Sequence, residues 1–218
     1  MKAIVFSILL GSCLVPAIQA QNYVSKVWVA DQGNGTYKNP VLYADYSDPD
    51  VCRVGNDFYL TSSSFGCLPG LQILHSKDLV NWTIVGAAVP RSLAPHTDTA
   101  PQHGNRVWAP CIRHHKGEFY IFWGDPDQGI FMTKATDVRG PWCEPVLVKA
   151  AKGIIDTTPL WDDDGRVYLA HAYAGSRAGL KSVIAVCELS ADATRTIGPS
   201  RIVFDGHEAH QTCEGPKF

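Results

Sequence analysis

The sequence predicts an all-β fold in which groups of short strands repeat as the blades of a β-propeller. Three observations predict it. No long segment shows the 3.6-residue apolar period of a helix, short apolar runs alternate with Gly, Asn, Asp or Pro turns, and one pattern returns roughly every 50 residues. Four strand candidates in each repeat are typical of a propeller blade, whereas a β-sandwich with coincidental internal similarity is the alternative.

The repeating units run approximately over residues 48–90, 105–150 and 155–205, and a fourth begins at Glu214. A propeller needs at least four blades to close. Three units and the start of a fourth do not close one, so the sequence predicts a truncated, incomplete propeller.

Two sets of matching segments define these units. Residues 70–82 and 129–142 share a Gly, alternating apolar residues, an Asp and a Trp in the same order. Residues 55–60, 117–122 and 164–169 each place a Gly turn before an aromatic and apolar run. The Gly and Asp residues in these copies favour tight turns between neighbouring strands.

The N-terminus has the pattern of an export signal. Lys2 precedes the apolar run 3–15, and Ala20 supplies a small residue for cleavage. The run is too short for a membrane span. We therefore expect an exported protein, periplasmic or extracellular, with lipid anchoring through Cys13 as a variant. The expected organisation is a signal peptide at 1–20, an N-terminal lead-in at 21–38 and an incomplete propeller domain at 39–218.

Composition excludes several classes of partner. A net charge of −2 gives no electrostatic basis for binding nucleic acid or an anionic membrane surface.

Widely spaced cysteines without a CxxC pair favour free thiols, several of them buried, over a disulfide framework. After the signal these cysteines are Cys52, Cys67, Cys111, Cys143, Cys187 and Cys213.

No metal site is predicted from the residues. Asp162–Gly165 lacks the alternating ligands of a calcium loop and is interpreted as a hairpin turn. His207, His210 and Cys213 resemble zinc ligands, but no fourth ligand follows them.

Three carboxylates in distinctive settings are the candidate catalytic residues. Asp48, Asp156 and Glu214 each stand at or just before the first strand of a unit. The innermost strands of a propeller surround its axis, so equivalent positions in different blades converge on one pocket. Glycoside hydrolysis needs one carboxylic acid and one carboxylate on opposite sides of a sugar, and a third acid can tune the other two.

These residues and their neighbours resemble glycoside hydrolase family 43. The resemblance covers nearly everything from Asn39 onward, and the order and spacing of its motifs make it specific. The matching segments are Tyr46–Val51, Ser63–Phe65 with Pro69–Leu71, His75–Trp82, Val107–Pro110, Ile155–Asp156 with Pro159–Leu160, and Glu214–Pro216. The resemblance implies a five-bladed β-propeller, of which this chain holds about three blades and the start of a fourth, and hydrolysis with inversion of β-xylosides, α-L-arabinofuranosides and arabinans.

The resemblance also implies a role for each carboxylate. Asp48 is similar to the general base that activates water, Glu214 to the general acid, and Asp156 to the residue that orients this acid and raises its pKa by like-charge repulsion. Two positions depart from the family pattern, since Thr157 replaces a frequent Pro and Cys111 replaces an acidic or small polar residue.

Phe65 and Trp108 are the candidate substrate-binding residues. Each lies in a loop-like setting beside Gly or Pro, where an aromatic face can form the wall of a sugar pocket. Arg113 is a weaker candidate on an expected inner strand. Asp50 and His75 are interpreted as structural.

The leading hypothesis is an exported glycosidase that removes arabinofuranose or xylose from plant cell-wall polysaccharides and oligosaccharides, with exo action because the loop Ser62–Pro69 can close one end of the pocket. The alternatives are a catalytically inactive sugar-binding propeller and a structural or protein-interaction propeller.

The resemblance implies that no cofactor is required. Some family members carry a central calcium or sodium ion, but the sequence does not assign ligands for such an ion here.

Overall fold

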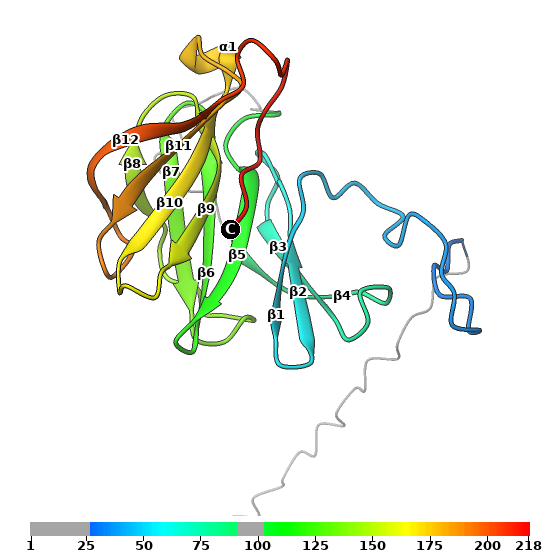
Figure 1. The fold of residues 1–218 in the computed structure, drawn as a ribbon. Coiled ribbons are helices and arrows are strands. Elements are labelled where there is room, and N and C mark those ends of the chain that lie inside the picture. Colours follow the sequence, from blue (N-terminus) through cyan, green and yellow to red (C-terminus); the bar gives the residue numbers. More distant parts are fainter. Residues whose placement is uncertain (1–26, 91–102) are drawn as a thin grey trace, which may run out of the picture.

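Three four-stranded antiparallel sheets make up the computed structural model, which describes residues 27–90 and 103–218 (Figure 1). The first sheet contains β1 (Asp50–Val54), β2 (Asp57–Thr61), β3 (Gly70–Ser76) and β4 (Thr83–Val89). The second contains β5 (Trp108–His115), β6 (Glu118–Asp125), β7 (Gly129–Ala135) and β8 (Val146–Ala150). The third contains β9 (Ile154–Trp161), β10 (Val167–Tyr173), β11 (Val183–Leu189) and β12 (Thr196–Asp205), with the short helix α1 (Gly175–Ala178) between β10 and β11.

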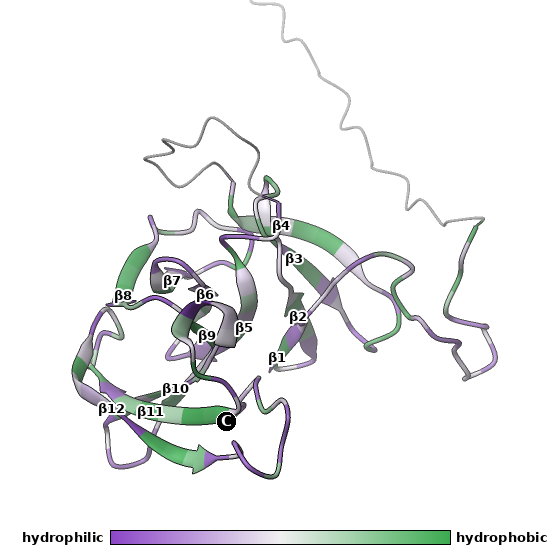
Figure 2. Cartoon of the chain, turned by 90° about the horizontal axis from the view of Figure 1, so that it is seen from above, coloured by the Kyte–Doolittle hydropathy of each residue, from purple (hydrophilic) through white to green (hydrophobic). Residues whose placement is uncertain are grey.

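Each sheet is one blade of a propeller. Its strands are hydrogen-bonded in chain order, and the first strands β1, β5 and β9 lie innermost, with β1 against β5 and β5 against β9. Seen from above, the sheets radiate outward from these three strands (Figure 2). The observed blades coincide with the three predicted units, so the propeller prediction is confirmed and the β-sandwich alternative is wrong.

The core lies between successive blades, and β6 shows why. Residues 119–123 of this strand form an unbroken apolar run because both faces of the strand are covered. Phe119, Ile121 and Trp123 pack toward the first blade, whereas Tyr120 and Phe122 pack toward the third. Successive side chains of a strand point to opposite faces, so one strand joins two hydrophobic clusters and fixes three blades in one body.

The repeated turns have equivalent structures. Gly55, Gly117 and Gly165 follow the first strand of their blades and have φ values of 62°, 82° and 83°, in the left-handed region that favours glycine. The third of these closes the predicted Asp162–Gly165 hairpin turn, in which the Gly165 N–H donates to the Asp162 carbonyl. The sequence similarity between units therefore reflects a shared chain geometry.

A second repeated turn follows the third strand of each of the first two blades. In both copies an Asp carboxylate accepts at least one backbone N–H, and a Trp indole N–H donates to a carbonyl of the same turn. The residues are Asp78 with Trp82 and Asp137 with Trp142. These hydrogen bonds explain why Asp and Trp recur in order in the sequence.

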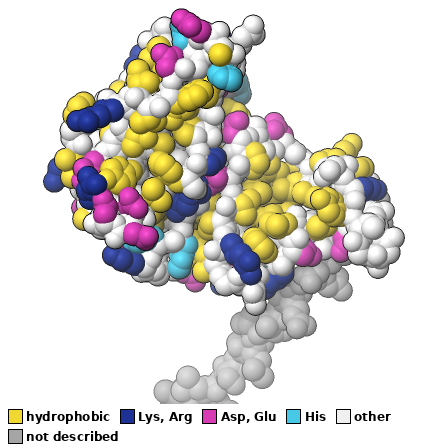
Figure 3. Space-filling model, viewed as in Figure 1, with side chains coloured by type: hydrophobic (Ala, Val, Ile, Leu, Met, Phe, Trp, Pro, Cys, Tyr) yellow, Lys and Arg dark blue, Asp and Glu magenta, His cyan; other side chains and the backbone are white. Residues whose placement is uncertain are grey.

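Apolar side chains remain exposed on the outer strand of the third blade (Figure 3). Ile202, Val203 and Phe204 of β12 are 55%, 62% and 44% exposed. Residues 206–218 follow β12 without forming a strand, and they return beside the inner strands, where Lys217 Nζ lies 3.1 Å from Asp50 Oδ1.

Candidate active site

All five predicted site residues line one cavity of about 360 Å³. They are Asp48, Phe65, Trp108, Asp156 and Glu214, and the lining is completed by Ala109, Ile155, Ala174, Gly175 and Ser176. The inner strands explain this convergence. Asp48 precedes β1, Trp108 opens β5 and Asp156 lies near the start of β9, so the same end of each inner strand meets at the cavity.

Asp48 is held by hydroxyl groups from two segments. Its Oδ2 atom accepts hydrogen bonds from Ser63 Oγ at 2.8 Å and from Ser47 Oγ at 3.3 Å. The Ser63 hydroxyl also accepts the Ala109 N–H at 2.9 Å, which ties the carboxylate to the second blade. With a φ of 47°, Asp48 adopts a left-handed backbone that L residues rarely take, and such strain is common at functional sites.

Sequence reasoning missed Ser63 as a site residue. One signal could have found it. Ser63 stands two residues before the candidate Phe65, within the segment Ser63–Phe65 that carries the family resemblance.

Asp156 is the carboxyl group whose pKa is most clearly perturbed in the cavity. Its pKa is raised to about 6, chiefly by burial and also by the negative charges of Glu214 and Asp48. The Gly215 N–H, which donates to Asp156 Oδ2 at 3.0 Å, and the Lys217 cation act in the opposite direction. The three carboxylates are therefore close enough to interact electrostatically.

The Gly215 hydrogen bond also positions the neighbouring Glu214. Gly215 has a φ of 65°, which glycine adopts without strain, and its N–H points at the third blade's inner strand. This contact attaches the segment that carries Glu214 to β9 through Asp156. Asp156 thus contacts the chain of the expected acid directly.

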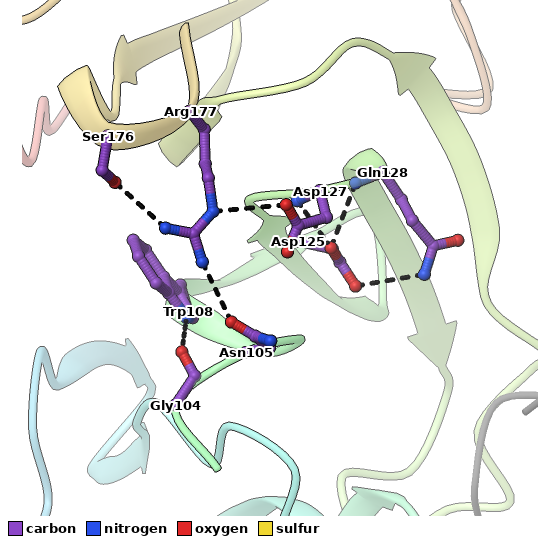
Figure 4. A network of polar contacts seen from close by, with 8 residues as sticks. All are labelled: Gly104, Asn105, Trp108, Asp125, Asp127, Gln128, Ser176 and Arg177. Carbon is purple, nitrogen blue, oxygen red and sulfur yellow. Dashed lines mark hydrogen bonds and ion pairs between the residues drawn. The ribbon is translucent and has the colours of Figure 1, made fainter. Parts of the chain in front are cut away.

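The two aromatic residues are fixed by backbone and ring contacts. Phe65 has a φ of 51°, and its N–H donates to the Val107 carbonyl at 2.9 Å, next to Trp108. The indole N–H of Trp108 donates to the Gly104 carbonyl at 2.7 Å, and Arg177 lies over its ring (Figure 4). The backbone of Phe65 and the side chain of Trp108 are therefore both held in place beside the cavity.

The two departures from the expected motif pattern do not reach the cavity. Cys111 and Thr157 are fully buried, and neither lines the cavity wall. Cys111 packs in the hydrophobic cluster between the second and third blades. In the described part of the chain all six cysteines are free thiols.

A polar network joins the three inner strands below the cavity. Asp50 Oδ2 on β1 accepts hydrogen bonds from Arg113 Nη1 at 2.6 Å and from the Ile112 N–H at 2.8 Å, both on β5. Arg113 Nη2 donates to Thr158 Oγ1 on β9 at 2.9 Å. Lys217 adds a second cation to the same carboxylate. Asp50 is therefore structural, as expected, and Arg113 is a link between blades.

Arg113→Met should destabilise the fold by about 3 kcal/mol, because Asp50 is only 8% exposed and its charge would then be compensated only by Lys217, whose side chain is 43% exposed. Urea unfolding at neutral pH measures this change. The double variant with Asp50→Asn should recover most of the loss. A cost below about 1 kcal/mol for Arg113→Met would show that this network does not stabilise the blade arrangement.

Neither a metal site nor a membrane-crossing helix is found in the described residues. No group of three or more His, Cys, Asp or Glu residues among them is arranged to hold a metal ion. Asp50, on the inner strand β1, already faces two cations and does not fit as a calcium ligand. No helix within these residues is long and apolar enough to cross a membrane.

His75 braces the first blade, as expected from the sequence, since its Nε2 forms a hydrogen bond with the Asp57 carboxylate.

Comparison with known proteins gives a consistent result. Residues 37–218 match the model of the family described as glycosyl hydrolases family 43. The chain is 37% identical over 194 residues to a putative beta-xylosidase of Xylanibacter ruminicola, covering 89% of this chain and 34% of that protein. It is 36% identical over 147 residues to a non-reducing end alpha-L-arabinofuranosidase of Bacteroides ovatus, covering 63% of this chain and 26% of the relative.

Solved structures agree. A xylan beta-1,4-xylosidase from Bacillus halodurans C-125 matches with a TM-score of 0.70 and 30% identity over 82% of this chain and 35% of that chain. The chain spans about a third of the length of the curated relatives it matches first.

Proposed function

The chain belongs to glycosyl hydrolases family 43, and from that premise we propose that its cavity is the catalytic centre of an inverting glycosidase. In the whole protein it would release terminal L-arabinofuranose or D-xylose from arabinoxylan- or arabinan-type polysaccharides and oligosaccharides of plant cell walls. The proposal rests on one observation above all. Asp48, Asp156 and Glu214, from three separate parts of the chain, share a single cavity with two aromatic side chains.

The proposed reaction is a single displacement. Asp48 removes a proton from water, whose oxygen attacks the anomeric carbon. The bond from that carbon to the leaving oxygen breaks on the opposite face of the sugar. Glu214 transfers its proton to the leaving oxygen, so the product sugar has inverted configuration. Proton exchange with solvent then returns Asp48 to its ionised form and Glu214 to its protonated form.

The surrounding contacts support these roles. Ser63 and Ser47 hold one oxygen of Asp48, which orients the carboxylate toward a fixed position for water. The Gly215 N–H bond to Asp156 holds the backbone beside Glu214. Phe65 and Trp108 supply apolar ring surface of the kind that contacts the faces of sugars.

The chemistry also bears on the alternatives. A sugar-binding propeller without activity has no need for three carboxylates in one cavity, and a structural propeller has no need for the cavity itself. Exo action is favoured because Phe65, from the loop Ser62–Pro69, lines the cavity. Export through residues 1–20, which lie outside the described residues, with Cys13 as a lipid attachment variant, is part of the proposal and fits a cell-wall substrate.

Hydrolysis of aryl α-L-arabinofuranoside and aryl β-D-xyloside by the full natural protein containing this sequence tests the proposal. Asp48→Asn should lower kcat/KM by at least about 100-fold, because the general base is lost. Asp163→Asn, in an exposed hairpin turn, is the matched control and should retain full activity. Well-folded protein that cuts neither substrate, nor arabinan or xylan, would favour the sugar-binding alternative.

A further inference from the structure

One wall of the cavity is built across two blades. Ala174, Gly175 and Ser176, at the start of α1 in the third blade, line it together with Trp108 from the second blade. Arg177 follows directly in the chain but does not line the cavity. Its side chain instead reaches toward the second blade and lies over the Trp108 ring (Figure 4).

The Arg177 guanidinium makes four contacts, three of which cross between the blades. Nε donates to Asp127 Oδ1 at 3.2 Å, and Nη2 donates to Asn105 Oδ1 at 3.0 Å. The guanidinium carbon lies 5.7 Å from the centre of the Trp108 ring, within the range of a cation–π interaction. The fourth contact, Nη1 to Ser176 Oγ at 3.2 Å, joins Arg177 to a residue that lines the cavity.

Asp127, which accepts a hydrogen bond from Arg177, lies in a turn of the second blade that is itself held by hydrogen bonds. Asp125 is 6% exposed, and its Oδ1 atom accepts the N–H groups of Asp127 and Gln128 at 2.9 and 3.1 Å. The Gln128 side-chain amide donates to Asp125 Oδ2 at 3.2 Å. These bonds hold the β6–β7 turn in one shape, so Asp127 presents its carboxylate at a constant position.

Backbone hydrogen bonds also hold the helix α1 in place. The Ala174 N–H donates to the Gly153 carbonyl, and the Gly153 N–H donates to the Pro126 carbonyl, both at 2.8 Å. A Cβ atom on Gly153 would lie 2.6 Å from Ala178 Cβ, so only glycine allows this approach. The backbone thus places α1 near the second blade, and Arg177 makes the side-chain connection to Trp108.

We propose that Arg177 is a positioning residue for sugar binding, which fixes Trp108 and α1 as a preformed wall for the non-reducing-end pentose. This inference rests on the proposed function and extends it. A preformed wall avoids the entropy cost of ordering side chains when the sugar binds. Arg177 acts on sugar binding and not on the three carboxylates, so its loss should weaken substrate and transition state equally.

Arg177→Met in the full natural protein should raise KM for the preferred aryl pentoside about tenfold and leave kcat within about threefold. Arg177→Lys keeps the positive charge but loses the planar guanidinium group, so its KM should lie between those of the parent and Arg177→Met. The matched control is Arg166→Met. Arg166 also pairs with an Asp, Asp164, and lies 5.3 Å from the ring of Tyr168, but it stands in an exposed turn that does not line the cavity. Its loss should leave KM unchanged.

Tryptophan fluorescence titrated with free L-arabinose and D-xylose separates this inference from the proposed function. If the parent protein binds a pentose without hydrolysing any substrate, the proposed function fails, and weaker binding by Arg177→Met still supports the positioning role. Unchanged KM and unchanged sugar binding in Arg177→Met would overturn the inference. So would a fall in kcat at constant KM, or an equal effect of Arg166→Met. A parent that neither binds nor cleaves pentosides would overturn both.

Discussion

Glu214→Gln is expected to lower kcat/KM about 10,000-fold for substrates whose leaving group is another sugar, but only about tenfold or less for a dinitrophenyl pentoside. A sugar alcohol is too basic to leave without a proton, so it depends on the general acid. A dinitrophenolate leaves as a stable anion and needs no proton. The measurement is kcat/KM across a series of aryl pentosides of decreasing leaving-group acidity.

Two matched variants make this result specific to the acid. Asp48→Asn should lose activity by a similar factor for every leaving group, because activation of water is common to all of them. Glu208→Gln changes an exposed glutamate in the same C-terminal segment and should behave as the parent. A uniform loss in Glu214→Gln across the series would contradict the role of proton donor.

The blade pattern was predictable from sequence because its determinants are local. Gly55, Gly117 and Gly165 need a left-handed backbone, and the Asp and Trp of each repeated turn bond within a few residues of each other. The strand β6 was also predictable from its local sequence. A strand covered on both faces carries apolar residues at every position, so its length and its turns identify it.

The convergence of the carboxylates was predictable from topology. Asp48, Asp156 and Glu214 are far apart in the chain, but positions at the start of successive blades meet at the axis in any propeller. The prediction needed only the repeat and the position of each carboxylate within its repeating unit. Within this set the structure places a raised pKa on Asp156, whose carboxyl group is buried.

The supporting contacts were not predictable, because each joins residues from different blades. Arg113 bonds Asp50 and Thr158, which are 63 and 45 positions away, and Arg177 bonds Asn105 at a distance of 72 positions. Nothing in the local sequence of an arginine indicates which distant acceptor it will meet. Periodicity identifies the strands, but it leaves the side-chain pairing across blades open.

The pKa of Asp156 ties stability to pH in a direction that can be worked out. In the unfolded chain this carboxyl has its ordinary pKa of 3.8, and in the folded protein burial raises the pKa to about 6. Below pH 4 it is protonated in both states and carries no penalty. Between pH 4 and 6 only the unfolded chain ionises, so the free energy of unfolding falls, and above pH 6 the loss reaches at most about 3 kcal/mol.

Asp156→Asn is therefore expected to be more stable than the parent at neutral pH while losing about 1,000-fold in kcat/KM. Asn keeps an oxygen that can accept the Gly215 N–H, but it carries no charge beside Glu214 and Asp48. The gain in unfolding free energy should rise from near zero at pH 4 to about 2 kcal/mol at pH 7, because only the parent carries the buried Asp156 charge as the pH rises. Urea unfolding of the two proteins across this range measures the difference. A difference that is constant with pH would mean that Asp156 ionises in the fold as it does in the unfolded chain. A variant that gains stability and keeps its activity would remove Asp156 from the catalytic set, because the cost of burying this charge in the folded protein would then serve no step of the reaction.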